Sequence, residues 1–318
     1  MFSSFIKLIR LPNLIFVVAI QYIMRWCIIA PIIGAHEFDL QFGEFNFALL
    51  VLATILLTAS GYIINDYFDT ESDLFNKPHK VTIGKTITRK MAMNLHIALN
   101  LIAVAISFYI SFKIGIYKIG FIFIIISGLL WFYSSSYKRQ FLVGNLIVAL
   151  LAGLVPFVVA LFEIPSLNKE YAEILIQRNA NFNLVIYWIL GFSLFSFITT
   201  FFREIIKDIE DFEGDKTFGS NTMPIIIGVF YSKIVAIFLI IVTISALFYV
   251  QFVYISTLNS LIYIIIALII PLLFLIYKII IAKTKEHFHF ASILSKIIMI
   301  LGVLYSIVAC YNFSNYLL

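Results

Sequence analysis

The stretch Asn65-Asp66-Tyr67-Phe68-Asp69-Thr70-Glu71-Ser72-Asp73 places four acidic groups directly after the apolar run from Phe47 to Ile64. Asp66, Asp69 and Asp73 stand at i, i+3 and i+7, so in a helix their carboxylates share one face. Like charges held together repel unless a cation lies among them. Hard oxygen ligands suit Mg²⁺, which takes one or two carboxylates and shares its other positions with water and phosphate oxygens. The stretch therefore predicts a magnesium site at the end of an apolar helix.

The same acidic spacing returns in the segment from Arg203 to Asp215, where Asp208, Asp211 and Asp215 repeat the pattern D-x-x-D-x-x-x-D. Of the 17 Asp and Glu residues in the chain, ten lie in these two stretches, and each stretch follows an apolar run. Chance is a poor explanation for this recurrence. Two carboxylate clusters that hold metal around one diphosphate are the simplest chemical interpretation, and the six aspartates are the candidate catalytic residues.

The composition indicates an integral membrane protein. Hydrophobic residues make up 62% of the 318 residues and charged residues 12%, with a mean hydropathy of +1.05, whereas soluble domains carry about 25% charged residues. The net charge of +5 would suggest nucleic acid in a soluble protein, but here the basic residues lie between apolar segments, where they set topology. Cys27 and Cys310 lie inside apolar segments, so neither a disulfide framework nor a zinc site is expected.

Nine apolar stretches approach the length of about 20 residues that a helix needs to cross a bilayer. They run through residues 14–33, 47–64, 91–112, 119–133, 141–162, 184–202, 224–250, 261–281 and 291–311. With nine spans, 17 Lys and Arg residues fall on the side of the N-terminus and four on the other side. This asymmetry orients both acidic stretches toward the cytoplasm, with the cell inner membrane as the expected location. We expect one membrane domain over residues 1–318 with two weakly repeated halves, 1–162 and 184–318.

The two acidic motifs in a chain of nine spans resemble those of the UbiA superfamily of intramembrane prenyltransferases. Gly61-Tyr62-x-x-Asn65-Asp66 and Arg203-Glu204-x-x-Lys207-Asp208 look most like the branch that alkylates geranylgeranylglyceryl phosphate. The resemblance implies a single helical bundle around a central cavity and Mg²⁺-dependent transfer of a polyprenyl group from its diphosphate to an acceptor. It also adds Asn65 to the six aspartates as a metal ligand. The chain departs from the family pattern at Lys77-Pro78-His79-Lys80, where Arg-Pro is common, and at Met223, where Leu is usual.

Basic residues on the side of the acidic motifs are candidates for binding the diphosphate, although each could equally set topology or bind lipid headgroups. Lys138 is favoured among them, because the segment Tyr133–Arg139 resembles the family's tyrosine-and-basic loop. The candidate diphosphate ligands are Asn65, Lys77, Lys138, Arg139, Arg203 and Lys207.

The acceptor remains open at this stage. Lys77, Lys80, Lys138 and Arg139 offer the positive charge that a lipid glycerol phosphate needs, but an aromatic acid of quinone biosynthesis is the alternative. An ion-coupled transporter is the alternative of another class, although transport sites lie near the membrane midplane and these acids follow the ends of spans. Gln21 and Arg25 share one face of the first span and either line the cavity or form hydrogen bonds between helices.

Overall fold

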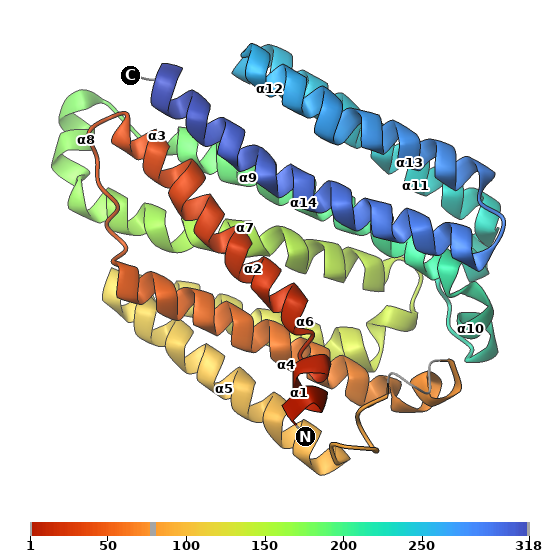
Figure 1. Ribbon diagram of the computed structural model, residues 1–318. Helices are drawn as coiled ribbons and strands as arrows, with labels where there is room; N and C mark the ends of the chain where they lie inside the picture. The colour runs from red at the N-terminus through yellow and green to blue at the C-terminus, as the bar shows by residue number, and fades with distance from the viewer. Residues whose placement is uncertain (1, 77–80, 317–318) are drawn as a thin grey trace. The chain divides into compact units, whose positions relative to one another are not determined.

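The computed structural model describes the backbone of residues 2–76 and 81–316 and the side chains of residues 4–70 and 81–314. In the described part the chain is helical, and its bridge between Ile83 and Ile87 is isolated (Figure 1). Nine helical segments there are long and apolar enough to span a membrane, which confirms the predicted all-helical, multi-pass protein. They cover Leu11–Gly34, Glu44–Thr70, Arg89–Ile114, Tyr117–Ser135, Val143–Glu170, Asn183–Glu210, Met223–Ile255, Leu258–Ile281 and Lys285–Ser314.

Two helices extend well beyond the apolar runs that predicted them. Helix α4 covers Glu44–Asn76 and helix α9 covers Asn183–Glu210, whereas the apolar runs end at Ile64 and Phe202. The 33 residues of α4 rise about 50 Å, against about 30 Å for the hydrocarbon core of a bilayer. Each helix therefore carries acidic residues past the apolar layer without a break in its backbone.

The chain divides into two compact units. The first contains residues 1–22, 40–138 and 158–182, and the second contains residues 23–39, 139–157 and 183–318. The helix that crosses residue 22 and helix α7 (Val143–Glu170) each contribute residues to both units. The proposed halves 1–162 and 184–318 stay a prediction.

In the first unit, α4 packs against α5 (Arg89–Ile114) and α6 (Phe121–Ser135). Gly61 permits the approach of α6, because a Cβ atom there would lie 2.8 Å from a methyl carbon of Leu130. Thr88 caps the start of α5, and Gly115, with φ of +82°, ends it. The short helices α1 (Phe2–Leu8) and α8 (Ala172–Arg178) belong to this unit, as do the 3-10 turn η2 (Tyr117–Gly120) and most of α2 (Leu11–Ile23).

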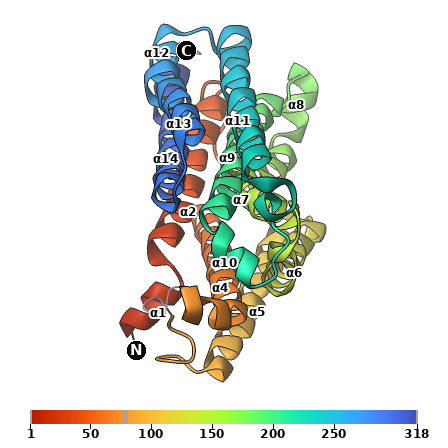
Figure 2. The same ribbon diagram turned by 90° about the vertical axis from the view of Figure 1, so that its right-hand side faces the viewer.

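In the second unit, α9 packs against α11 (Met223–Val250) and α14 (Lys285–Tyr316), as Figures 1 and 2 show. Buried aliphatic and aromatic side chains fill the space between them, including Phe202, Ile206 and Ile298. The remaining elements of this unit are α3 (Ala30–Gly34), α10 (Phe212–Thr217), α12 (Leu258–Tyr263) and α13 (Ile270–Ile281), with π-helical turns η1 (Met24–Ile29), η4 (Gln251–Ile255) and η5 (Ile264–Ile269). The 3-10 turn η3 (Tyr137–Arg139) crosses the boundary of the units.

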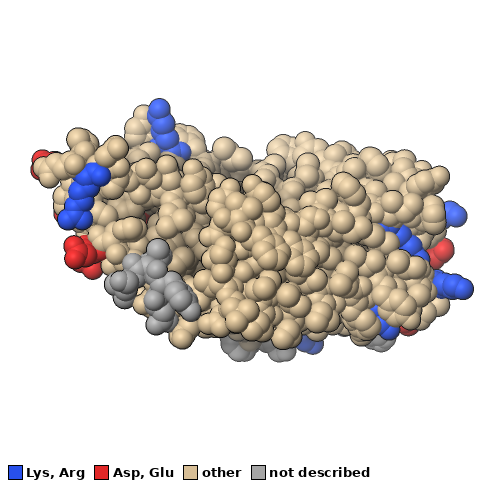
Figure 3. All heavy atoms as spheres, turned by 90° about the horizontal axis from the view of Figure 1, so that it is seen from above, with Lys and Arg blue, Asp and Glu red and all other residues tan. Residues whose placement is uncertain are grey.

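Surface charge follows the pattern expected of membrane helices. On the face that Figure 3 shows, charged side chains gather toward helix ends and the surface along the helices is tan. Gln21 and Arg25, the two polar residues predicted to share one face of the first span, both contact neighbouring side chains. Gln21 is fully buried and its Nε2 donates to Thr54 Oγ1 at 3.1 Å, so the interhelical hydrogen bond predicted as one explanation for Gln21 is confirmed. Arg25 is 1% exposed, and its guanidinium lies 5.8 Å from the ring centre of Trp26.

Candidate active site

The first acidic motif occupies the polar end of α4. Asn65 and Asp69 are four residues apart on the helix, and Asn65 Nδ2 donates to Asp69 Oδ2 at 3.0 Å. Asp66 accepts a hydrogen bond from Arg10 at 2.8 Å between Oδ1 and a guanidinium nitrogen. Both carboxylates thus take part in polar contacts at the place that the sequence predicts.

In the sequence, Arg10 is one of the 17 basic residues on the side of the N-terminus, and the structure gives it a specific position. It lies between α1 and α2 with φ of +53°, a left-handed conformation that non-glycine residues seldom adopt. Its guanidinium lies 4.8 Å from the ring centre of Tyr62 and contacts Asp66. No local sequence signal links it to the motif, because 56 residues separate Arg10 from Asp66.

Lys138 forms an ion pair with Asp69 through its Nζ and Oδ1 atoms. The Lys138 side chain is 14% exposed and that of Asp69 20% exposed, so water screens this pair less than a surface pair. The structure thus brings together Asn65, Asp69 and Lys138, three of the predicted site residues. Lys77, Lys80 and the side chain of Asp73 lie outside the described residues.

The second acidic motif begins with Asp208 near the end of α9. Asn145, in the part of α7 that belongs to the second unit, donates from Nδ2 to Asp208 Oδ2 at 2.8 Å. Asn145 is not among the site residues predicted from the sequence. Its position as an amide side chain within the apolar stretch 141–162 could have indicated a polar contact, because a polar side chain in a membrane span needs a partner.

Helix α9 ends at Glu210, so the second motif does not continue as one regular helix through Asp215. Asp211 has φ of −95° and ψ of 10°, and α10 follows it. The break is slight, because the Asp211 N–H still bonds to the Lys207 carbonyl at 2.9 Å and the Asp215 N–H to the Asp211 carbonyl at 3.0 Å. Asp208 and Asp215 belong to successive helices. Lys285 Nζ lies 3.9 Å from Asp211 Oδ1.

Glu204 joins two of the predicted basic residues. Its Oε1 atom accepts from an Arg203 guanidinium nitrogen at 2.6 Å, and its Oε2 atom lies 3.3 Å from Lys207 Nζ. Glu204 is 9% exposed, so one largely buried carboxylate holds both cations. The side chain of Arg139 is exposed, and its backbone carbonyl accepts from the Asn221 N–H at 2.7 Å.

The donor atoms at both motifs fit a hard divalent cation. Among the described side chains, no three His, Cys, Asp or Glu residues are grouped closely enough to hold a metal without further ligands. Mg²⁺ does not need such a cage, since it commonly binds one or two carboxylates and completes its shell with water and phosphate oxygens. Asp66 and Asp69 on α4, and Asp208 with Asp211 at the end of α9, each provide such a pair of carboxylates.

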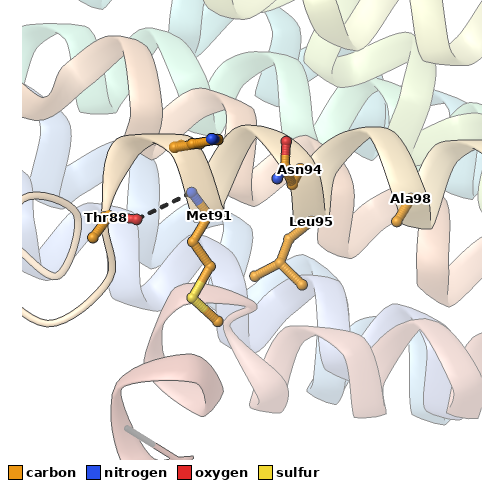
Figure 4. Close-up of a pocket in the computed structure, with 6 residues that line it drawn as sticks. Thr88, Met91, Asn94, Leu95 and Ala98 are labelled. Atoms are coloured by element: carbon orange, nitrogen blue, oxygen red, sulfur yellow. Dashed lines mark hydrogen bonds between the residues drawn. The ribbon is translucent and has the colours of Figure 1, made fainter.

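A shallow hollow of about 410 Å³ lies along the start of α5 (Figure 4). It is lined by residues of the first turns of α5 and the Thr88 cap, including Met91, Asn94 and Leu95. The dashed line in Figure 4 marks the hydrogen bond from the Met91 N–H to Thr88 Oγ1, 3.2 Å long. This hollow contains none of the predicted site residues, so we assign it no part in the chemistry.

Comparison with protein families gives a match over most of the chain. Residues 26–309 match the model of the UbiA prenyltransferase family. The digeranylgeranylglyceryl phosphate synthase of Thermococcus sibiricus is 32% identical over 225 residues, which are 69% of this chain and 71% of that protein.

Two solved structures share the fold. The first has a TM-score of 0.69 at 25% identity, and the match covers 97% of this chain and 98% of that chain. It is described as giving structural and mechanistic insights into the biosynthesis of digeranylgeranylglyceryl phosphate synthase in membranes. The other is a UbiA homologue from Archaeoglobus fulgidus bound to GPP and Mg²⁺, with a TM-score of 0.57 at 16% identity, covering 96% of this chain and 99% of its own.

Proposed function

Because the chain belongs to the UbiA prenyltransferase family and is a prenyltransferase, we propose that it transfers a geranylgeranyl group from geranylgeranyl diphosphate to geranylgeranylglyceryl phosphate. The bond between the allylic carbon and the diphosphate oxygen breaks, and that carbon forms an ether with the acceptor hydroxyl, which loses its proton. The observation that carries the proposal is the pair of acidic motifs at the polar ends of α4 and α9, in a chain 32% identical to a synthase of this name.

The proposed metal ligands are Asn65, Asp66, Asp69, Asp73, Asp208, Asp211 and Asp215. A bound Mg²⁺ ion neutralises charge on a leaving diphosphate and so lowers the barrier to ionisation. The Mg²⁺ and GPP of the Archaeoglobus fulgidus homologue support the choice of ion and of donor class. Asn145 supports Asp208 by fixing the orientation of its carboxylate through the 2.8 Å hydrogen bond.

The proposed diphosphate ligands are the predicted residues Asn65, Lys77, Lys138, Arg139, Arg203 and Lys207. Lys138 is the best supported, because it contacts Asp69 and is shielded from water. Cations that are already oriented stabilise negative charge on the leaving group without reorganising during the reaction. Lys138 therefore serves both to orient Asp69 and to stabilise the diphosphate.

The glycerol phosphate acceptor is supported by the name of the relative and by the basic residues near the motifs. An aromatic acid remains the second candidate, because a carboxylate is also anionic. We further propose that both motifs face the cytoplasm of the cell inner membrane, since 17 of the Lys and Arg residues lie on that side of the nine-span topology. Family membership leaves the transporter alternative without support.

Product formation with the two acceptor classes tests the proposal. Purified protein in neutral lipid nanodiscs is given labelled geranylgeranyl diphosphate, Mg²⁺ and either geranylgeranylglyceryl phosphate or 4-hydroxybenzoate. We expect the labelled ether of the glyceryl phosphate and little product from the aromatic acid. Efficient prenylation of the aromatic acid with none of the glyceryl phosphate would overturn the acceptor and leave prenyl transfer in place.

A further inference from the structure

The first turns of α14 lie against the end of α9, at the second acidic motif. His289 Nδ1 lies 2.8 Å from Glu210 Oε1, and Lys285 Nζ lies 3.9 Å from Asp211 Oδ1. Lys285 and His289 are four residues apart, so they share one face of α14. Two contacts, one helical turn apart on α14, therefore reach two consecutive residues of the motif.

Glu210 is the last residue of α9, and Asp211, a proposed metal ligand, follows it directly. The Glu210 side chain is 14% exposed, so its charge needs a hydrogen-bond donor. An ionised carboxylate only accepts hydrogen bonds, so the Nδ1–H group of His289 is the donor. A hydrogen bond to a charged acceptor is stronger than one between neutral groups. This bond therefore fixes the end of α9 to α14.

The core beneath this contact holds both helices in place. Ile209 and Phe288, each next in sequence to one of the two hydrogen-bonded residues, are 4% and 5% exposed and belong to one hydrophobic cluster. Lys233 of α11 donates from Nζ to the backbone carbonyl of Ala282 at 2.6 Å, which ties the turn before α14 to α11. His289 therefore extends from a fixed support.

Regular helix geometry ends directly after this contact. Asp211 has φ of −95° and ψ of 10°, and the helix that follows it, α10, is only six residues long. A continuing helix thus does not set the direction of the Asp211 carboxylate. Metal ligands need to be held within about 0.5 Å of their productive positions. The contact from α14 restrains the residue immediately before Asp211 and is placed to provide that support.

We propose that His289 is a positioning residue of the metal site: it holds Glu210, and with it the end of α9, so that Asp211 presents its carboxylate to the divalent cation. The inference rests on the proposed function, because it needs the acidic motifs to bind Mg²⁺. His289 acts through Glu210 and is not itself a metal ligand. Residues that orient metal ligands typically contribute about 10–100-fold in metal affinity.

The test measures the binding of Mn²⁺, as a paramagnetic substitute for Mg²⁺, by electron paramagnetic resonance. The full chain is held in phosphatidylcholine nanodiscs with inorganic diphosphate present. His289→Phe keeps a ring but removes the donor, and it should weaken Mn²⁺ binding about tenfold. His289→Asn keeps an N–H donor and should bind Mn²⁺ within about threefold of wild type. His36→Phe makes the same exchange at an exposed position outside the motifs and should leave Mn²⁺ binding unchanged.

Turnover separates support of the metal site from a general loss of structure. The Mg²⁺ concentration for half-maximal turnover of His289→Phe should rise about tenfold, whereas its turnover at saturating Mg²⁺ should stay within about twofold of wild type. The His289 side chain is 62% exposed, so this variant keeps the core intact. Glu210→Ala should also weaken Mn²⁺ binding, and adding His289→Phe to it should cause no further loss, because the histidine acts through this carboxylate.

Unchanged Mn²⁺ binding in His289→Phe, an equal loss in His289→Asn or His36→Phe, or a further loss in the double variant would overturn the inference. So would a loss of turnover in His289→Phe that saturating Mg²⁺ does not restore, since that result marks a purely structural role. If wild-type protein binds no Mn²⁺ in the presence of diphosphate, the proposed function itself fails at its metal site. Wild-type binding of Mn²⁺ beside an unaffected His289→Phe variant removes only the role of His289.

Discussion

Replacement of Asp69 by asparagine separates the catalytic role of this carboxylate from its structural one. The substitution is nearly isosteric and removes the charge that faces Lys138, whose side chain is 14% exposed. A charged hydrogen bond contributes about 1.5–3 kcal/mol, and losing the carboxylate that faces a largely buried cation adds to the loss. We therefore expect Asp69→Asn to lower the stability of the protein by about 2 kcal/mol. Turnover should fall about 10²–10³-fold, as when one electrostatic stabiliser of a transition state is removed.

The double variant Asp69→Asn/Lys138→Met distinguishes the two effects. Removing the Lys138 charge, which no longer faces a carboxylate at position 69, should recover most of the lost thermal stability, measured by intrinsic fluorescence in detergent. Prenyl transfer should stay low. Turnover is measured as labelled ether from labelled geranylgeranyl diphosphate at saturating Mg²⁺. If Asp69→Asn turned over at the wild-type rate, or if the double variant regained activity together with stability, Asp69 would be a structural residue only.

Two further predictions concern residues that the sequence did not single out. Asn145→Leu keeps a similar shape but removes the hydrogen-bond donor to Asp208. We expect about a tenfold loss of turnover, as for other residues that orient metal ligands. Wild-type kinetics in this variant would contradict the proposed role of Asn145 in orienting Asp208. Glu163 is fully buried and its Oε1 accepts from the backbone N–H groups of Gln41 and Phe42 at 3.0 and 2.9 Å. Glu163→Leu should lower the melting temperature clearly, because each backbone N–H that loses its acceptor costs about 1–3 kcal/mol. Glu163→Gln keeps an acceptor and should lower the melting temperature less. Equal melting temperatures of the two variants would refute this role of Glu163.

The spans and the positions of the acidic motifs could be predicted from sequence, because hydropathy and charge are local properties of the chain. The run from Phe47 to Ile64 located a span, and the acids after it located its polar end. The true length of α4 could not be predicted from hydropathy, since its last turns leave the apolar layer and continue as a polar helix to Asn76.

The hydrogen-bond and ion-pair partners of the motif residues could not be predicted from one sequence, because they depend on tertiary contacts. Arg10 lies 56 residues from Asp66, and Asn145 lies 63 residues from Asp208. The break after Glu210 could not be predicted either, since the spacing of the aspartates is compatible with one continuous helix. The backbone geometry at Asp211 decides between a continuous and a broken helix.

The dependence of product formation on divalent metal tests the central claim most directly. Wild-type protein is stripped with excess chelator, given labelled geranylgeranyl diphosphate and geranylgeranylglyceryl phosphate, and then titrated with Mg²⁺. Our account predicts no ether product in chelator and recovery of wild-type turnover as free Mg²⁺ is restored, with Asp211→Asn inactive at every Mg²⁺ concentration. Undiminished product formation in excess chelator, or full activity in Asp211→Asn, would contradict the claim that the acidic motifs act through a bound metal ion.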